Sequence, residues 1–202
     1  FFAWTEGPCK KCRSEYSKRK NTPRSFDFRK PSCSLVQRGR AMAYVILRTD
    51  KYKTRDTIAG LVGHHLRIPG SKLDNVDLSR SHLNVVIGAH DRDSFNKAVR
   101  GRIATCTRKP RPDANKVVEM MLGASPEFFE GKSYEEQKAY LYDCLDFAKQ
   151  FFGEANIVGA YMHFDESTPH LSILAVPIET SVRKTKKMER EVTTLNASHF
   201  FA

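Results

Sequence analysis

The stretch His163-Phe164-Asp165-Glu166-Ser167-Thr168-Pro169-His170 determines the fold expected for this chain. Apolar runs flank it on both sides, Ile157 to Met162 before it and Leu171 to Ile178 after it. The polar segment between the runs has the composition of a turn. We therefore expect two strands that pair as a β-hairpin, with His163 and His170 facing each other at its mouth.

This hairpin loop is rich in side chains that bind metal ions. Its two histidines and two acidic residues offer imidazole and carboxylate ligands, which suit divalent ions such as Mn²⁺, Zn²⁺ or Mg²⁺. An incomplete protein shell would leave positions for water or a phosphate. The alternative is a polar hairpin whose histidines only hydrogen-bond the turn. Because four potential ligands lie in one short loop, the metal site is the better hypothesis.

Composition indicates one domain with an appendage and a polyanionic partner. The chain has 202 residues, of which 40% are hydrophobic, and a net charge of +11. Nucleic acid is the partner that such a charge favours, since each neutralised phosphate releases a counterion. An anionic membrane is the rival, but no apolar run approaches the roughly 20 residues that span a bilayer. We expect a soluble, cytoplasmic protein without a membrane partner, and the odd count of five cysteines fits a reducing compartment.

Residues 1–42 are expected to form a basic, cysteine-containing N-terminal arm. They are rich in Lys, Arg, Ser and Pro, and no apolar periodicity persists in them. Cys9 and Cys12 have the spacing of a zinc knuckle, and Cys33 could be a third ligand, but no fourth ligand lies nearby. Two interpretations remain open: a structural Zn²⁺ site, or a basic arm with unpaired thiols.

Residues 43–202 have the pattern of an α+β domain, an antiparallel sheet with helices packed on one face. A capping box at Ser133 starts the clearest helix, and Thr54 or Asp56 caps another. The remaining expected elements are a strand Ala43–Arg48, a helix Thr54–Leu66, a strand Ser81–Ile87, a helix Ser94–Thr105 and a strand or helix Asn115–Leu122.

A second polar group, His64, His65 and Arg67, lies at the end of the expected helix Thr54–Leu66. A neutral histidine is a nucleophile, and Arg67 could hold a phosphate from the same helix face as His64. The helix dipole alone also favours histidines at a C-terminus, so this pair is ambiguous by itself. Beside a metal loop and a strong positive charge, it becomes a candidate for phosphoryl transfer.

Three ordered motifs resemble the MobV (Mob/Pre) family of plasmid relaxases: HxxR from His64 to Arg67, SRSHLN from Ser79 to Asn84, and HxDESTPH from His163 to His170. The resemblance covers about residues 43–202 and leaves the arm outside. It implies the HUH-endonuclease fold and metal-dependent nicking of one DNA strand at a plasmid transfer origin. It also implies a covalent link between the protein and the 5′ phosphate, and rejoining of the strand.

The resemblance also implies a role for individual residues. It makes His64 the nucleophile, Arg67 its companion, and His163 and His170 ligands of Mn²⁺ or Mg²⁺, with Glu166 as a further ligand or as the group that orients His64. His65 receives no role. Contacts to single-stranded origin DNA are expected from Tyr44, Arg67, Arg80 and Asn84, with Tyr52 a further stacking candidate and Tyr44 also the runner-up nucleophile.

One residue departs from the family pattern. The motif continues PHxH in the family, whereas this chain has Ser172 in place of the third histidine. On a strand Ser172 projects on the same face as His170, but a hydroxyl is a poorer ligand than an imidazole. Loss of that ligand would weaken metal binding or leave Glu166 and water to complete the shell.

Ser172 therefore keeps an alternative function open. The chain could be a relaxase derivative without nicking activity, a nucleic-acid-binding or structural component of a larger nucleic-acid assembly. A hydrolytic metalloenzyme acting on a small substrate is disfavoured, because +11 is an unusual charge for that purpose. Because the family continues into further helices, a C-terminally truncated domain is also among the expectations.

Overall fold

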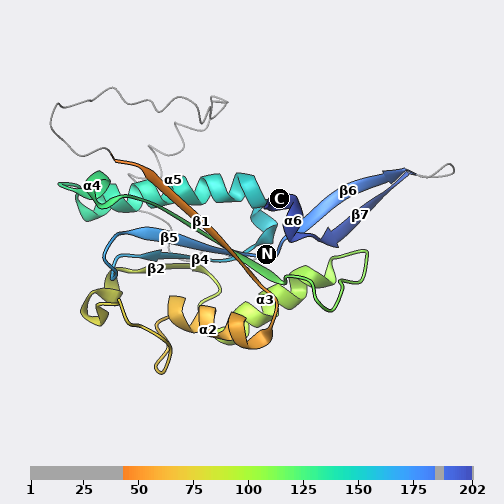
Figure 1. Cartoon of the computed structure of the whole chain (residues 1–202), viewed down its shortest axis with the longest axis horizontal. Coiled ribbons are helices and arrows are strands. Elements are labelled where there is room, and N and C mark those ends of the chain that lie inside the picture. Colours follow the sequence, from red (N-terminus) through yellow and green to blue (C-terminus); the bar gives the residue numbers. More distant parts are fainter. Residues whose placement is uncertain (1–42, 185–188, 202) are drawn as a thin grey trace. The chain divides into compact units, whose positions relative to one another are not determined.

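The computed structural model describes residues 43–184 and 189–201. Its centre is a five-stranded antiparallel sheet with the strand order β1-β3-β5-β4-β2 (Figure 1). The strands are β1 (Val45–Tyr52), β2 (Val85–Gly88), β3 (Val117–Ala124), β4 (Ile157–His163) and β5 (His170–Ala175). The hairpin expected around His163 and His170 is confirmed as β4–β5, in the middle of the sheet. The predictions for residues 1–42, including the zinc ligands Cys9, Cys12 and Cys33, lie outside the described residues.

Helices cover both faces of the sheet, where the sequence predicted one covered face. In Figure 1 α5 runs along one side of the strands, and α2 and α3 lie on the other side. The helices are α2 (Arg55–His65), α3 (Arg92–Ala104), α4 (Pro126–Phe129), α5 (Tyr134–Phe152) and α6 (Ala197–Phe200), with 3₁₀ turns η1 (Leu78–Leu83) and η2 (Glu154–Asn156). Within the described part of the chain, no helix has the length and apolar character needed to cross a membrane.

The α5 face forms the larger apolar core. The predicted capping box starts this helix: the Ser133 side chain accepts from the N–H of Glu136, and the Glu136 carboxylate accepts from the N–H of Ser133. Residues at helical spacing then become buried against alternate residues of β3, β4 and β5. This core contains Leu141, Leu145, Ala148, Phe152, Val118, Met120, Leu122, Ala160, Met162, Leu171 and Ile173.

The opposite face carries the polar site. Side chains alternate between the two faces of a strand, so His163 and His170 project on the side of α2 and α3. A second apolar core holds these helices to the sheet through Ile58, Val62, Phe95, Val99, Val117, Tyr161 and Leu174. Thr54 caps α2 as predicted, accepting from the N–H of Thr57. The end of α2 thereby comes to lie beside the mouth of the hairpin.

Two further features differ from the sequence prediction. The expected strand Ser81–Ile87 is divided into η1 and the shorter β2, because Asp77 accepts from the N–H of Ser79 and closes a 3₁₀ turn first. A separate two-stranded ribbon, β6 (Ile178–Lys184) and β7 (Glu189–Leu195), follows the sheet. Most side chains of this ribbon are exposed or half-buried, so it lacks the apolar alternation that reveals a strand in sequence.

Candidate functional site

The mouth of the β4–β5 hairpin brings three potential metal ligands together. His163 and His170 are cross-strand partners, and their ring centroids are 5.1 Å apart. Ligand atoms of His163, Glu166 and His170 all lie within 4.8 Å of one another. Nδ1 of His170 donates to the carbonyl of Thr168 at 3.0 Å, which leaves its Nε2 free for a metal. Two imidazoles and a carboxylate suit a divalent ion, so the three predicted ligands fit the group that the sequence implied.

Arg67 ties α2 to the hairpin loop. Its Nε donates to Oδ2 of Asp165 at 2.9 Å, and its Nη2 donates to Oδ1 of Asp165 and to Oε1 of Glu166, both at 2.7 Å. The side chain of Asp165 is fully buried. Burial would raise the pKa of Asp165, but hydrogen bonds from Arg67 and Ser81 lower it to about 2. Arg67 is therefore a clamp on both carboxylates of the loop.

The position of this clamp depends on an unusual backbone conformation. Arg67 has a φ of +53°, in the left-handed region that normally holds glycine at a helix end. Its N–H donates to the carbonyl of His64, and the N–H of Ile68 donates to that of Gly63. These bonds form a Schellman motif, which ends α2 directly after the two histidines. The strain costs about 1 kcal/mol or more, and the buried ion pair with Asp165 holds Arg67 in this conformation.

Both ring nitrogens of His64 have partners in the site. Its Nδ1 donates to the carbonyl of Lys72 at 3.0 Å, so the lone pair of the neutral ring lies on Nε2. Nε2 is 3.3 Å from Oε1 of Glu166, and the side chain is about one-third exposed. Hydrogen bonding to Glu166 raises the pKa of His64 although partial burial opposes this. Nη1 of Arg67 also lies 3.2 Å from Nε2 of His64, so in the neutral ring this nitrogen accepts from the guanidinium. His64 thus has a defined tautomer, and its Nε2 faces both Arg67 and Glu166.

Glu166 contacts His64 and also belongs to the group of potential metal ligands. Oε1 faces His64 and Arg67, whereas Oε2 lies 4.0 Å from Nε2 of His170. Burial would raise the pKa of Glu166, but its hydrogen bond with His64, the charge of His170 and the contacts with Arg67 lower it to about 2. The carboxylate is therefore ionised at neutral pH, and both roles foreseen for it are compatible with its position.

A buried histidine and a half-buried glutamate that the sequence did not assign extend the site inward. Nδ1 of His65 lies 3.0 Å from Nε2 of His163, and Nε2 of His65 lies 3.0 Å from Oε1 of Glu119. Burial lowers the pKa of His65 and lowers that of His163 further, so both are neutral. A glutamate inside the apolar run Val117 to Leu122 was the available signal, since an unpaired charge is rarely buried.

Of the other residues that were predicted to contact DNA, two are exposed and two have side chains that hydrogen-bond inside the protein. Arg80 is exposed and lines a cavity of about 560 Å³ beside Asp165 and Glu166. Tyr44 is 62% exposed, next to the start of β1. Asn84 instead faces inward, where its Oδ1 accepts from the N–H of Phe164 at 2.8 Å. Tyr52 donates to Oε2 of Glu119 at 2.9 Å and so supports the interior of the site.

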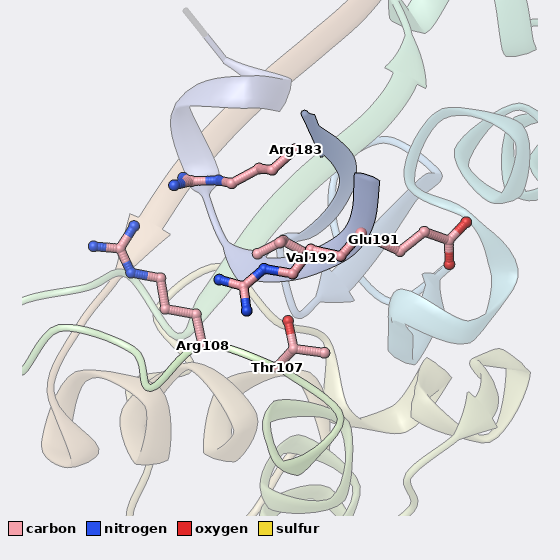
Figure 2. A pocket seen from close by; sticks show the side chains of 6 residues that line it. Thr107, Arg108, Arg183, Glu191 and Val192 are labelled. Carbon is pink, nitrogen blue, oxygen red and sulfur yellow. The ribbon is translucent and has the colours of Figure 1, made fainter. Parts of the chain in front are cut away.

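A second cavity, of about 290 Å³, lies where the β6–β7 ribbon meets the segment after α3. Three arginines line it, Arg108, Arg183 and Arg190, together with Thr107, Glu191 and Val192. Figure 2 shows the guanidinium groups of Arg108 and Arg183 on the same side of this pocket, with the carboxylate of Glu191 directed away from them. The N–H of Thr107 donates to Oγ1 of Thr193 at 2.9 Å, which joins the segment to β7. We call this the arginine pocket.

Comparison with known protein sequences identifies relatives over the same region. The family model for plasmid recombination enzymes, Mob_Pre, matches residues 42–199. A plasmid recombination enzyme of Bacillus thuringiensis is 30% identical over 146 residues, 71% of this chain and 33% of that protein. A 65 kDa protein of Zymomonas mobilis subsp. mobilis is 32% identical over 160 residues, 78% of this chain and 25% of that protein. The chain thus spans a third or less of the length of these two relatives.

The fold matches solved relaxase domains. The MobM relaxase domain (MOBV; Mob_Pre), Mn-bound and bound to plasmid pMV158 oriT DNA, aligns with a TM-score of 0.64 at 26% identity. The alignment covers 79% of this chain and 77% of that chain. A second Mn-bound structure of that domain with oriT DNA, at pH 4.6, gives a TM-score of 0.63. The α+β fold expected from the sequence is confirmed.

Proposed function

Because this chain belongs to the Mob_Pre family of plasmid recombination enzymes, we propose that it is a plasmid mobilization relaxase. In this role it nicks one strand of DNA at an origin of transfer, keeps the 5′ phosphate covalently attached and later rejoins the strand. Such a role places the protein in the cytoplasm with the plasmid. Its similarity to the MobM relaxase domain, which was solved with oriT DNA and Mn, supports this proposal.

One observation carries the proposal. Glu166 contacts both His64 and a metal-ligand cluster, with Oε1 at 3.3 Å from Nε2 of His64 and Oε2 at 4.0 Å from Nε2 of His170. Nη1 of Arg67, at 3.2 Å from Nε2 of His64, gives up this contact when the nitrogen attacks. A phosphodiester between His64 and the cluster would meet a nucleophile on one side and, on the other, residues that could hold a Lewis-acidic ion. Phosphoryl transfer requires such positioning of a nucleophile and of a charge-neutralising group.

We propose His64 as the nucleophile. Its Nε2 attacks phosphorus in line, a P–N bond forms, the P–O3′ bond breaks, and the 3′ oxygen leaves and takes a proton from water. The Nδ1–H of His64 remains bound to the carbonyl of Lys72, so the ring becomes cationic as the bond forms. The ionised Glu166 lies beside this ring and offsets the new charge. The phosphoramidate retains the bond energy that rejoining needs.

A divalent ion is the cofactor, and we propose Mn²⁺ or Mg²⁺ at His163, Glu166 and His170. When bound, the ion withdraws charge from the non-bridging oxygens of the scissile phosphate. Arg67 supports this arrangement because it fixes the Glu166 carboxylate through its Nη2 at 2.7 Å. Carboxylate and imidazole ligands together suit Mn²⁺ well, whereas Mg²⁺ prefers oxygen ligands.

Exposed cations support the binding of DNA around this centre. Arg80 is exposed and lines the cavity next to Glu166, which supports a contact with a phosphate of the bound strand. Tyr44 exposes an aromatic ring on which a base can stack. The arginine pocket offers a further phosphate contact on the β6–β7 ribbon, outside the catalytic centre (Figure 2).

A denaturing gel tests the proposed activity. The protein is incubated with Mn²⁺ and labelled single-stranded oligonucleotides that tile both strands of its replicon, with the pMV158 oriT strand as a further substrate. We expect one oligonucleotide to be cleaved at one position, with its 3′ part transferred to the protein, and chelation of the metal to prevent this. Binding without cleavage of any strand would favour the alternative that Ser172 suggests, a nucleic-acid-binding protein derived from a relaxase.

A further inference from the structure

We propose that His65 supplies the third imidazole ligand of the metal, in place of the histidine that this chain lacks at position 172. This inference rests on the proposed function only for the presence of the metal. The sequence assigned His65 no role, and the cluster formed by His163, Glu166 and His170 does not include it. His65 reaches that cluster through its contact with His163.

The distance between the two rings suits two ligands of one ion. Nδ1 of His65 and Nε2 of His163 are 3.0 Å apart. Two imidazole nitrogens bound at about 2.1 Å and at a right angle around one ion are about 3.0 Å from each other. Without a metal, a hydrogen bond between the nitrogens satisfies this pair, and the nitrogens face each other along it. Binding of one ion to both nitrogens replaces that proton and requires the two rings to turn, so that both lone pairs point to the ion.

Glu119 holds His65 in the way that metal-binding histidines are usually held. Oε1 of Glu119 accepts from Nε2 of His65 at 3.0 Å, which directs the lone pair of Nδ1 toward His163. Ligating histidines usually donate their second N–H to a carboxylate or a carbonyl in this manner. Glu119 is itself fixed by the hydroxyl of Tyr52 at 2.9 Å, and its hydrogen bond with Ser172 contributes to its lowered pKa.

Arg67 does not prevent metal binding at Nε2 of His163. Its Nη2 has two hydrogens but lies within 2.9 Å of three acceptors: Nδ1 of His163, Oδ1 of Asp165 and Oε1 of Glu166. The two charged carboxylates are the stronger acceptors. The contact with His163 can therefore be given up, so that Nδ1 of His163 carries the ring proton when Nε2 binds the ion.

The position of His65 also explains why serine is tolerated at position 172. Ser172 is 2% exposed and is the cross-strand partner of Tyr161. The ring of His65 stacks on Tyr161, with centroids 5.0 Å apart and planes 6° apart, and it meets the ring of His163 end to end through the contact between their nitrogens. Glu119, which accepts from His65, also forms a hydrogen bond with Ser172, so His65 lies next to the position where the family has its third histidine.

Metal titration of the whole protein tests this assignment. Free Mn²⁺ is measured by electron paramagnetic resonance, without DNA, for the parent, His65→Asn and the control His90→Asn, whose histidine is exposed and outside the cluster. We expect His65→Asn to bind Mn²⁺ more than about tenfold more weakly, and the control to match the parent. In the Co²⁺-loaded protein, the number of strongly shifted imidazole N–H signals in the proton spectrum should fall by one in His65→Asn.

A double variant distinguishes the loss of a metal ligand from simple misfolding. The double variant His65→Asn with Ser172→His returns the imidazole to β5 and should regain most of the lost Mn²⁺ affinity and the missing Co²⁺-shifted signal. Ser172→His alone should not tighten binding, since His65 already supplies the third imidazole. Unchanged Mn²⁺ affinity and an unchanged number of shifted signals in His65→Asn would overturn the proposal. Because these readouts involve no DNA, failure to nick would count against the proposed function and leave this assignment intact.

Discussion

The Nε2 atom of His64 and the Oε1 atom of Glu166 lie 3.3 Å apart, and this contact joins the proposed nucleophile to the loop that carries the proposed metal ligands. Glu166 is the largest cause of the raised pKa of His64. In the proposed reaction only neutral His64 attacks phosphorus, so protonation of its ring would set the acid limit. The same carboxylate would offset the cationic ring that forms during the attack.

The variant Glu166→Gln should therefore change both the pH dependence and the rate. Its His64 has a lower pKa, so the acid limb of single-turnover cleavage should move to lower pH. The rate on the plateau should fall by about tenfold or more, because a hydrogen bond to a charged group is removed. Cleavage at saturating Mn²⁺, followed across pH, measures both effects. If the acid limb of the pH–rate profile is the same in Glu166→Gln and in the parent, Glu166 is not the group that raises the pKa of His64.

Stability should depend on the buried pair of Arg67 and Asp165. The folded-state pKa of Asp165 is about 2, below its ordinary 3.8. A lowered pKa contributes stability that is fully present above the ordinary value and is lost as the pH falls from about 4 to about 2. Asp165→Asn should cost at least about 2 kcal/mol at pH 7, with Arg67 left partly unpaired, and the difference from the parent should shrink below pH 4. Urea denaturation at several pH values gives these free energies. An equal difference at pH 7 and pH 2 would contradict the assignment.

Much of the fold and of the site could be predicted from local patterns. The hairpin around His163 and His170 follows from apolar runs on either side of a polar turn, and the caps at Thr54 and Ser133 follow from short-range hydrogen bonding. The motifs placed His64 and Arg67 at the end of one helix. The structure brings that helix end to the hairpin through the ion pairs of Arg67.

What the sequence did not predict depends on contacts between distant segments. His65 and Glu119 are 54 positions apart, and neither has a local pattern that relates it to the other. Asn84 was expected at the DNA, but its amide supports the N–H of Phe164, 80 positions away. The ribbon β6–β7 was missed because its strands are largely exposed and lack alternation. The left-handed conformation of Arg67 is likewise imposed by its tertiary partners.

The arginine pocket should contribute to the salt dependence of DNA binding. In the triple variant Arg108→Ala, Arg183→Ala and Arg190→Ala, the slope of log affinity against log salt should become shallower by about 0.7 to 0.9 for each phosphate that is no longer neutralised. Fluorescence anisotropy with a labelled origin strand at several salt concentrations measures this slope.

A matched control separates this local effect from a reduction in overall charge. Arg55→Ala, Lys97→Ala and Arg100→Ala together remove the same charge from exposed positions on α2 and α3. We expect this control to retain a steeper slope than the triple variant of the arginine pocket. Equal slopes for the two variants would show that the pocket makes no specific phosphate contact.

The chemistry of the adduct should identify its nitrogen linkage. A phosphoramidate on His64 should be hydrolysed in mild acid and survive in base, whereas a phosphotyrosine ester survives acid. Tyr44→Phe should still form the adduct, because the Tyr44 hydroxyl has no bond to make in the proposed reaction. Treatment of the isolated adduct at low and high pH, followed by gel electrophoresis, measures this difference. An acid-stable adduct that disappears in Tyr44→Phe would make Tyr44 the nucleophile.

Mapping the attached nucleotide tests the central claim most directly. The protein is incubated with Mn²⁺ and a cleavable origin strand, digested with nuclease and trypsin at neutral to basic pH, and sequenced by mass spectrometry. We predict a nucleotide on the tryptic peptide Asp56–Arg67, with fragment ions that place it on His64, and its loss in a His64→Ala variant that still binds the strand. A nucleotide on the peptide Ala41–Arg48, which contains Tyr44, or on His65, would contradict the account.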